Sequence, residues 1–223
     1  MHAGRGRADG LGVEARRAGE HARATGRRHA RHALAGIALA SAALLALVFS
    51  GLPSGVVIAG ELALLGALVA IERIGGPVVD RWLQGARGEE HVGALLAELE
   101  AEGWLAVHDL DTGRGNIDSV LVGPGGLFAV EVKSYAGRLR PADIRPDHLK
   151  QAWAQKRWLE RELGTPAEPL LVYSRAYLLG RGVTRSRGVI VMSARMLVGH
   201  LRRRAPRLSP AEVRALHAQL ASK

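Results

Sequence analysis

Asp118, Glu131 and Lys133 are the residues of this chain whose types and spacing point most directly to chemistry. Two carboxylates held close together repel each other, but they offer the hard oxygen ligands that Mg²⁺ prefers. A lysine two residues beyond one of them lies on the same face of a strand, because side chains alternate along a strand. Its ammonium group can stabilise charge on a phosphate or help to activate a water. The set suits metal-assisted hydrolysis of a phosphodiester.

The local sequence is expected to bring the two carboxylates together. Asp118 and Glu131 lie in two apolar segments that are joined by Pro124-Gly125. Proline suits the first central position of a type II turn, and glycine suits the second, which needs a positive φ. Pairing Gly123 with Gly126 in an antiparallel hairpin puts the two acids opposite each other, with Cβ atoms about 5 Å apart. Both strands are apolar on both faces, which favours burial in a sheet over a solvated Glu-x-Lys pair.

The residues around this hairpin resemble a known family. The segment 115–138 reads GNIDSVLVGPGGLFAVEVKSYAGR. An acid near the start of one strand, followed by E-x-K on the next, resembles the PD-(D/E)xK restriction-endonuclease-like nucleases. The fuller pattern resembles the NERD, or nuclease-related, domain more closely, and the similarity extends over residues 85–200. The family often has a histidine after the aspartate, where this chain has Ser119.

The resemblance implies a restriction-endonuclease-like mixed sheet flanked by helices and a divalent cation, Mg²⁺ or Mn²⁺, as cofactor. It implies that Asp118 and Glu131 hold the ion together with Glu89, because Gly88-Glu89 matches the G-E motif of the family. Lys133 would act in catalysis. A glutamine is expected on the helix after the E-x-K strand, where Gln151 matches better than Gln155 and would hold a phosphate or a water.

The implied partner is nucleic acid, with DNA as the first expectation. The implied activity is metal-dependent hydrolysis of its phosphodiester bonds. The alternative is a catalytically inactive module of the same fold that binds nucleic acid or a protein partner at the membrane. A third possibility is a structural membrane protein whose basic domain lies on anionic lipid.

Helices and strands are expected to alternate around these residues. Apolar residues at helical spacing predict a helix over 87–102, in which Glu89 is either a partner of the helix dipole in the first turn or a ligand. His108 and Asp109, at the end of the first expected strand, are given no role, and residues 134–137 are expected to leave the sheet. Strands are expected at 104–110, 169–174 and 188–193 with an Arg-rich loop between the last two, and helices at 147–163, 194–204 and 209–220. This order predicts an α/β fold with a mixed sheet.

Two apolar runs dominate the N-terminal part of the chain. Residues 33–52 carry no charge, and residues 56–71 carry only Glu61. The first run is long enough to span a bilayer, which needs about 20 residues. We expect a hairpin of two transmembrane helices over 33–73. One span followed by an interfacial helix is the alternative, because an acid within the membrane costs about 2.5–3.5 kcal/mol. A cleaved signal peptide is disfavoured by the long polar segment that precedes the first run.

Basic residues flank these runs and continue through the chain, which has a net charge of +10. Residues 1–32 form an arginine-rich arm that is expected to be disordered. Arginines also follow the second run, so both ends of the helix pair are expected to be cytoplasmic. The predicted location is therefore the cell membrane, multi-pass, with a cytoplasmic domain over 80–223. The remaining arginines suit a lipid bilayer or nucleic acid. The absence of cysteine excludes disulfides, thiolate metal sites and a cysteine nucleophile.

Overall fold

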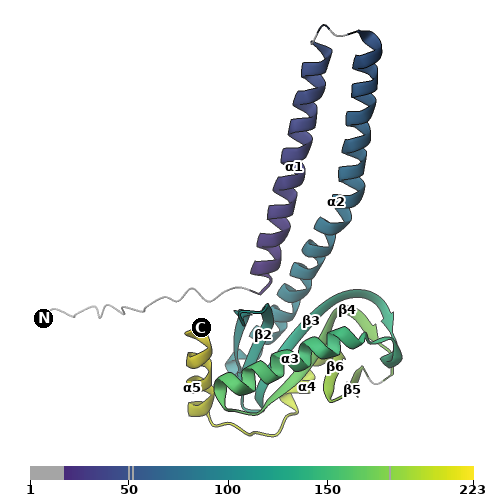
Figure 1. Cartoon of the computed structure of the whole chain (residues 1–223). Helices are drawn as coiled ribbons and strands as arrows, with labels where there is room; N and C mark the ends of the chain where they lie inside the picture. The colour runs from purple at the N-terminus through teal and green to yellow at the C-terminus, as the bar shows by residue number, and fades with distance from the viewer. Residues whose placement is uncertain (1–17, 50, 52, 181) are drawn as a thin grey trace, which may run out of the picture.

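The structure is a computed structural model that describes residues 18–223 except residues 50, 52 and 181 (Figure 1). Most of the basic arm predicted over 1–32 therefore lies outside the described residues. The part that is described is ordered, because the first helix, α1, runs over Glu20–Val48. Regular structure thus begins inside the segment for which the sequence predicted none.

Two long helices precede the sheet. α2 runs over Ser54–Ala97 and lies side by side with α1 in the opposite direction (Figure 1). Gly60 of α2 permits a close approach, since a Cβ atom there would lie 2.6 Å from a methyl carbon of Leu47 of α1. Nearer the sheet, Arg23 of α1 forms an ion pair with Glu90 of α2. The two helices are therefore held together at both ends of their contact.

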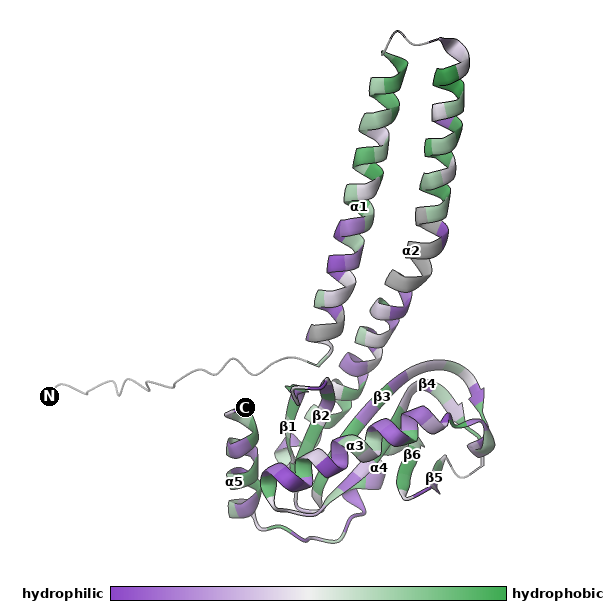
Figure 2. Ribbon diagram, in the orientation of Figure 1, coloured by the Kyte–Doolittle hydropathy of each residue, from purple (hydrophilic) through white to green (hydrophobic). Residues whose placement is uncertain are grey.

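The parts of α1 and α2 that lie farthest from the sheet are hydrophobic (Figure 2). Among the described residues, the stretch Arg23–Val48 is the one that is long and apolar enough to cross a membrane, and none of its most apolar window is buried. Ser54–Ala70 is apolar but shorter. A signal sequence near an N-terminus passes the same test, so this helix alone is weak evidence for a membrane segment. The second predicted span is not shown.

A six-stranded mixed sheet forms the centre of the C-terminal part (Figure 1). Its strands lie in the order β1-β2-β3-β4-β6-β5. β1, β2 and β3 are antiparallel neighbours, β3, β4 and β6 are parallel neighbours, and β5 is antiparallel to β6. The strand bounds are Leu105–Asp111, Asn116–Gly123, Gly126–Leu139, Ala167–Leu178, Val183–Ser186 and Val189–Ser193 for β1 to β6. The predicted α/β fold with a mixed sheet is confirmed.

Helices cover both faces of this sheet. On one face, Val92 and Leu96 of α2 and the short helix α4 (Leu197–Arg202) pack on apolar side chains of the inner strands. On the other face, α3 (Pro146–Leu163) and α5 (Pro210–Ala221) pack on the alternate side chains of the same strands. Single 3₁₀ turns lie at Glu100–Glu102, Pro141–Asp143 and Ala194–Met196. The buried strand residues therefore sit between two helical layers, as their apolar character on both faces predicted.

Three local predictions differ from the structure. No helix begins at Arg87, because α2 is continuous from Ser54, and Glu89 is therefore an interior residue that cannot serve as a first-turn partner of the dipole. Residues 134–137 do not leave the sheet, because β3 continues to Leu139 beside the equally long β4, with a register shift between Lys133 and Ala136. The Arg-rich loop expected before β6 contains β5, which pairs with β6.

Candidate active site

The hairpin register predicted from the sequence is present. β2 and β3 pair from Gly123 with Gly126 back to Ser119 with Val130, and one further step in this register brings Asp118 beside Glu131. At that step a side-chain hydrogen bond takes the place of a backbone one between the two strands: Asp118 Oδ2 accepts a hydrogen bond of 2.7 Å from the backbone N–H of Val132. The carboxylate of Asp118 is thereby held against β3.

The turn itself is not the predicted type II turn. The positive φ, 124°, belongs to Gly126, and Gly125 does not adopt one. Position 125 has glycine for a different reason: a Cβ atom there would lie 2.5 Å from Cβ of Arg204 and 2.9 Å from the ring of Trp104. Crowding by these two side chains, and not backbone conformation, requires glycine at the second turn position.

A third acid, Asp109, lies in the same row across the sheet. β1 pairs His108 with Ser119 and Leu110 with Ile117, so the register places Asp109 beside Asp118. Asp109 is 4% exposed and has a φ of 51°. A left-handed conformation at a non-glycine residue costs about 1–3 kcal/mol and is concentrated at functional sites. Asp109 was expected to have no role, although the sequence places it at the position of β1 that matches Asp118 of β2.

Glu89 reaches this row from α2. The preceding residue, Gly88, allows the helix to approach the sheet closely, because a Cβ atom there would lie 2.6 Å from Ser174 Oγ and 3.1 Å from Ser134 Cβ. Burial raises the pKa of Glu89 to about 7, and the negative charges of Asp109 and Glu131 contribute to the rise. The helix and the first three strands therefore gather four carboxyl groups into one electrostatically coupled site.

Burial disfavours the charged forms of the two hairpin acids. Burial raises the pKa of Asp118 well above its ordinary value, and the charges of Glu131 and Glu89 raise it further. Burial also raises the pKa of Glu131, although Lys133 and Gln155 oppose the rise. Oxygen ligands with surplus negative charge are the donors that a divalent cation such as Mg²⁺ takes. The donor chemistry fits such an ion, yet among the described residues no three His, Cys, Asp or Glu side chains are grouped closely enough to hold one.

Lys133 is the cation at the centre of this site. Its Nζ lies 2.5 Å from Glu131 Oε1 and donates a hydrogen bond of 3.1 Å to Gln151 Oε1. Burial by itself lowers the pKa of Lys133, but the attraction of Glu131, reinforced by Asp118 and Glu89, outweighs burial and raises the pKa above its usual value. Lys133 is therefore protonated at neutral pH, which suits it to stabilise negative charge and not to accept a proton.

Two glutamines of α3 contact these charged groups. Gln151, the residue favoured by the sequence, is exposed and accepts the bond from Lys133. Gln155, one turn later, is buried, and its Nε2 donates a hydrogen bond of 2.5 Å to Glu131 Oε2. Gln151 was the glutamine expected at the site, and Gln155 was given no role. Spacing of four residues on one helix face was the signal that both could reach the site.

A cleft of about 510 Å³ opens onto the site between α2 and β3. Glu89 and Lys133 line it, together with Arg81, Trp82, Gln84, Gly85, Val132 and Ser134. Trp82 stacks on His29 of α1, with ring centroids 6.3 Å apart. The cleft therefore makes the acid of α2 and the lysine of β3 accessible, and its rim is contiguous with the first helix.

The site can be compared with known proteins. No curated protein matches the chain, and no solved structure matches it. A protein family does match the part of the chain that contains Glu89, Asp118, Glu131, Lys133 and both glutamines of α3. The match ends at the last residue of β4 and leaves out the last two strands and the helices that follow. Residues 84–178 match NERD, the nuclease-related domain.

Proposed function

We propose that this chain is a membrane-anchored, metal-dependent nuclease that hydrolyses phosphodiester bonds of nucleic acid, DNA first among them. We place its domain with the PD-(D/E)xK nucleases. The observation that carries the proposal is the row of acids across β1 to β3 with Lys133 bonded to Glu131 beside it. The match to the nuclease-related domain covers all of these residues and supports the same reading.

Each residue has a role in this proposal. Glu89, Asp118 and Glu131 would hold Mg²⁺ or Mn²⁺, which when bound supplies a polarised water and charge neutralisation at the phosphate. Lys133 places a positive charge beside the scissile phosphate and stabilises the charge that develops there. Gln155 fixes the orientation of Glu131, and Gln151 holds the ammonium group of Lys133 at the mouth of the cleft.

A second candidate function is a binding module without catalysis. The observation that favours it is the engagement of Lys133 by Glu131 and Gln151, together with the lack of a grouped ligand set within the described residues. In that case the charged residues would bind nucleic acid or a protein partner at the membrane. Measurement of cleavage separates the two functions.

The membrane part of the proposal rests on α1 and α2. In the parts of these helices that lie farthest from the sheet, apolar side chains such as Leu39 of α1 and Leu62 of α2 are exposed (Figure 2). We propose that both helices enter the bilayer, with the start of α1 and the sheet on its cytoplasmic side. Reporter fusions at residues 1 and 223 should both report cytoplasm, and opposite locations would leave a single span.

The decisive experiment is a cleavage assay on the full chain in detergent micelles. Single- and double-stranded DNA and RNA are incubated with Mg²⁺, Mn²⁺ or EDTA. Lys133→Ala should cleave about 10²–10³-fold more slowly than the wild type. Lys223→Ala is the control, because it removes a lysine charge outside the site, where Lys223 pairs with Glu162 and lies over the ring of Trp158.

If the wild type cleaves nothing with either metal, the binding module is the better description. If Lys133→Ala cleaves as fast as the wild type, the role given to Lys133 is wrong.

A further inference from the structure

A second hollow, of about 480 Å³, lies beside the proposed active site. It is formed by the β1–β2 loop and one side of α3. Its charged and larger polar side chains are Arg114 from the loop and Gln151, Gln155, Arg157, Trp158 and Arg161 from α3. We call it the arginine groove. No acidic residue lines it, and three guanidinium groups do.

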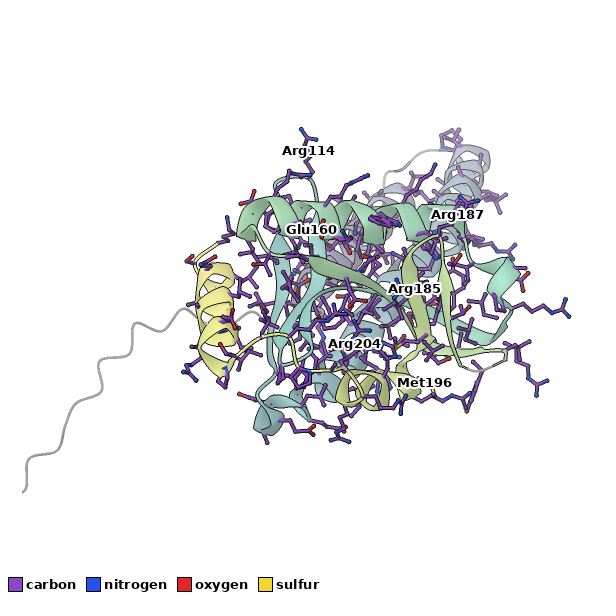
Figure 3. The ribbon with its side chains drawn as sticks, turned by 90° about the horizontal axis from the view of Figure 1, so that it is seen from below. Arg114, Glu160, Arg185, Arg187, Met196 and Arg204 are labelled. Carbon is purple, nitrogen blue, oxygen red and sulfur yellow. The ribbon has the colours of Figure 1, made fainter. Side chains whose placement is uncertain are left out.

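The three arginines of this groove are exposed and unpaired. Within the part of the chain that the structure describes, none of their guanidinium groups makes an ion pair or a hydrogen bond. Figure 3 shows Arg114 projecting from its loop beyond α3. Two acids of α3 close in sequence to these arginines already have partners. The carboxylate of Glu160 lies 2.6 Å from Lys156 Nζ and accepts a bond of 3.1 Å from the backbone N–H of Ala167, and Glu162 pairs with Lys223. The positive charge of the groove is therefore uncompensated.

Several other arginines of the domain are paired within it. Arg185, Arg204 and Arg207 all contact the carboxylate of Glu168 on β4. Arg202 forms a two-pronged contact with Glu102. These arginines are used within the domain. Exposed arginines without a partner, such as Arg138 and Arg187, also occur elsewhere, but the arginine groove gathers three of them around one hollow.

The arginine groove is continuous with the proposed active site. Gln151 and Gln155 line the groove, and the same two side chains bond to Lys133 and Glu131. Lys133 lines the cleft on the α2 side. The bonded pair Gln151 and Lys133 is therefore the boundary between groove and cleft. A chain of phosphates lying along the three arginines would meet Lys133 at its end.

We propose that the arginine groove binds the phosphate backbone of a nucleic-acid strand on one side of the phosphate that is cleaved. The proposal rests on the function proposed above and adds where the substrate lies. Free guanidinium groups bind phosphate oxygens with two parallel hydrogen bonds, and phosphate contacts position a strand without reading its sequence. Binding by this groove is therefore strongly dependent on salt and only weakly dependent on base sequence.

The test is binding of fluorescent 15-nucleotide DNA and RNA strands to the full chain in micelles with EDTA, which separates binding from metal-dependent cleavage. Affinity is measured from 50 to 300 mM salt. Each lost phosphate contact lowers the slope of log K against log salt by about 0.7–0.9. For the double variant Arg157→Gln/Arg161→Gln, the slope of log K against log salt should thus be smaller in magnitude than for the wild type by about 1.4–1.8. The variant should bind at least about tenfold more weakly at low salt.

The matched control is Arg138→Gln/Arg187→Gln, which removes the same charge from two exposed arginines. Arg138 lies at the end of β3, and Arg187 lies in the β5–β6 turn at the opposite edge of the sheet. The control should change affinity less than about twofold. The charge-preserving variant Arg157→Lys/Arg161→Lys should regain most of the lost slope, and it excludes misfolding as the cause of the loss.

Several results would overturn the proposal that the arginine groove binds a nucleic-acid strand. Equal losses in the groove variant and the control would show a general charge effect. An unchanged slope in the groove variant would show that these arginines touch no phosphate. Loss of binding to phosphatidylglycerol vesicles with unchanged oligonucleotide binding would assign the groove to lipid headgroups. A wild-type chain that binds no oligonucleotide also excludes the groove, whereas binding without cleavage in Mg²⁺ overturns only the proposed reaction.

Discussion

The side-chain amide of Gln155, on α3, fixes the carboxylate of Glu131, on β3. Gln155 Nε2 donates to Glu131 Oε2 over 2.5 Å, and the other oxygen of the same carboxylate faces Lys133 Nζ. Both residues are buried. A carboxylate that is bonded on both oxygens cannot rotate freely, so the direction in which Glu131 presents its charge is set by helix α3.

We therefore expect Gln155→Leu to damage the site more than Gln151→Leu. Loss of a buried hydrogen bond to a charged group costs about 1–3 kcal/mol, whereas the exposed Gln151 gives up a solvated contact. Gln155→Leu should lower the melting temperature and the cleavage rate together. Thermal unfolding followed by circular dichroism and the cleavage assay check this. Equal effects of the two variants would show that Glu131 is held by other means.

Asp118→Asn should remove activity without unfolding the chain. The asparagine Oδ1 can still accept the bond from the N–H of Val132, while one negative charge leaves a site in which the acids repel each other. We expect cleavage to fall by about 10²–10³-fold and the melting temperature in EDTA to be equal to or higher than that of the wild type. A large drop in melting temperature would mean that Asp118 is needed for folding and not for chemistry.

Binding of a divalent cation should depend on pH near neutrality. The pKa of Glu89 is raised to about 7 by burial and by Asp109 and Glu131, so below this pH a proton competes with the ion. Calorimetric titration with Mn²⁺ should show the affinity falling about tenfold per pH unit below 7 for one proton released.

Asp109→Asn supplies the internal control for this pH dependence. Asparagine tolerates the left-handed backbone of residue 109, and the substitution removes a charge that raises the pKa of Glu89. The fall in affinity should then begin at a lower pH than in the wild type. An affinity that is independent of pH in both proteins would exclude Glu89 as a ligand.

His148 should make the fold sensitive to acid. Burial lowers its pKa from 6.5 to about 4, with contributions from the charges of Lys133 and Arg145, and its Nδ1 lies 3.2 Å from the hydroxyl of Tyr173. Because the folded pKa lies below the unfolded one, the stabilisation is present above pH 6.5 and is lost as pH falls towards 4. Between pH 7 and pH 4.5, the melting temperature of His148→Gln should fall by less than that of the wild type. His217→Gln on α5 serves as the control and should follow the wild type.

The strands and the hairpin register were accessible from the sequence because they depend on local patterns. Apolar runs bounded by glycine and proline predict β2 and β3, and pairing Gly123 with Gly126 determines every later pair. The start of the helix expected over 209–220 is equally local, because Ser209 and Glu212 form a capping box in which the Ser209 N–H donates to Glu212 over 2.7 Å. These features need no knowledge of the rest of the chain.

Other features depend on contacts that are distant in sequence. A separate helix was expected over 87–102, yet α2 is continuous from Ser54 to Ala97. β3 remains in the sheet beyond Lys133 because β4 is long enough to pair with it. The positions of Asp109 and Gln155 depend on which strand lies beside β2 and which face of α3 meets the sheet. None of these follows from a local pattern.

Because α2 is continuous, one helix joins the apolar segment Ser54–Ala70 to Glu89 of the acid site. The nineteen steps along the chain from Ala70 to Glu89 rise about 28 Å at 1.5 Å per residue, and each residue turns the helix by about 100°. Inserting one alanine between them would lift Glu89 by about 1.5 Å and swing it by about 100° relative to the apolar end. The number of residues between the apolar segment and Glu89 therefore sets the distance of the cleft from that segment and the direction around the helix axis in which the cleft opens.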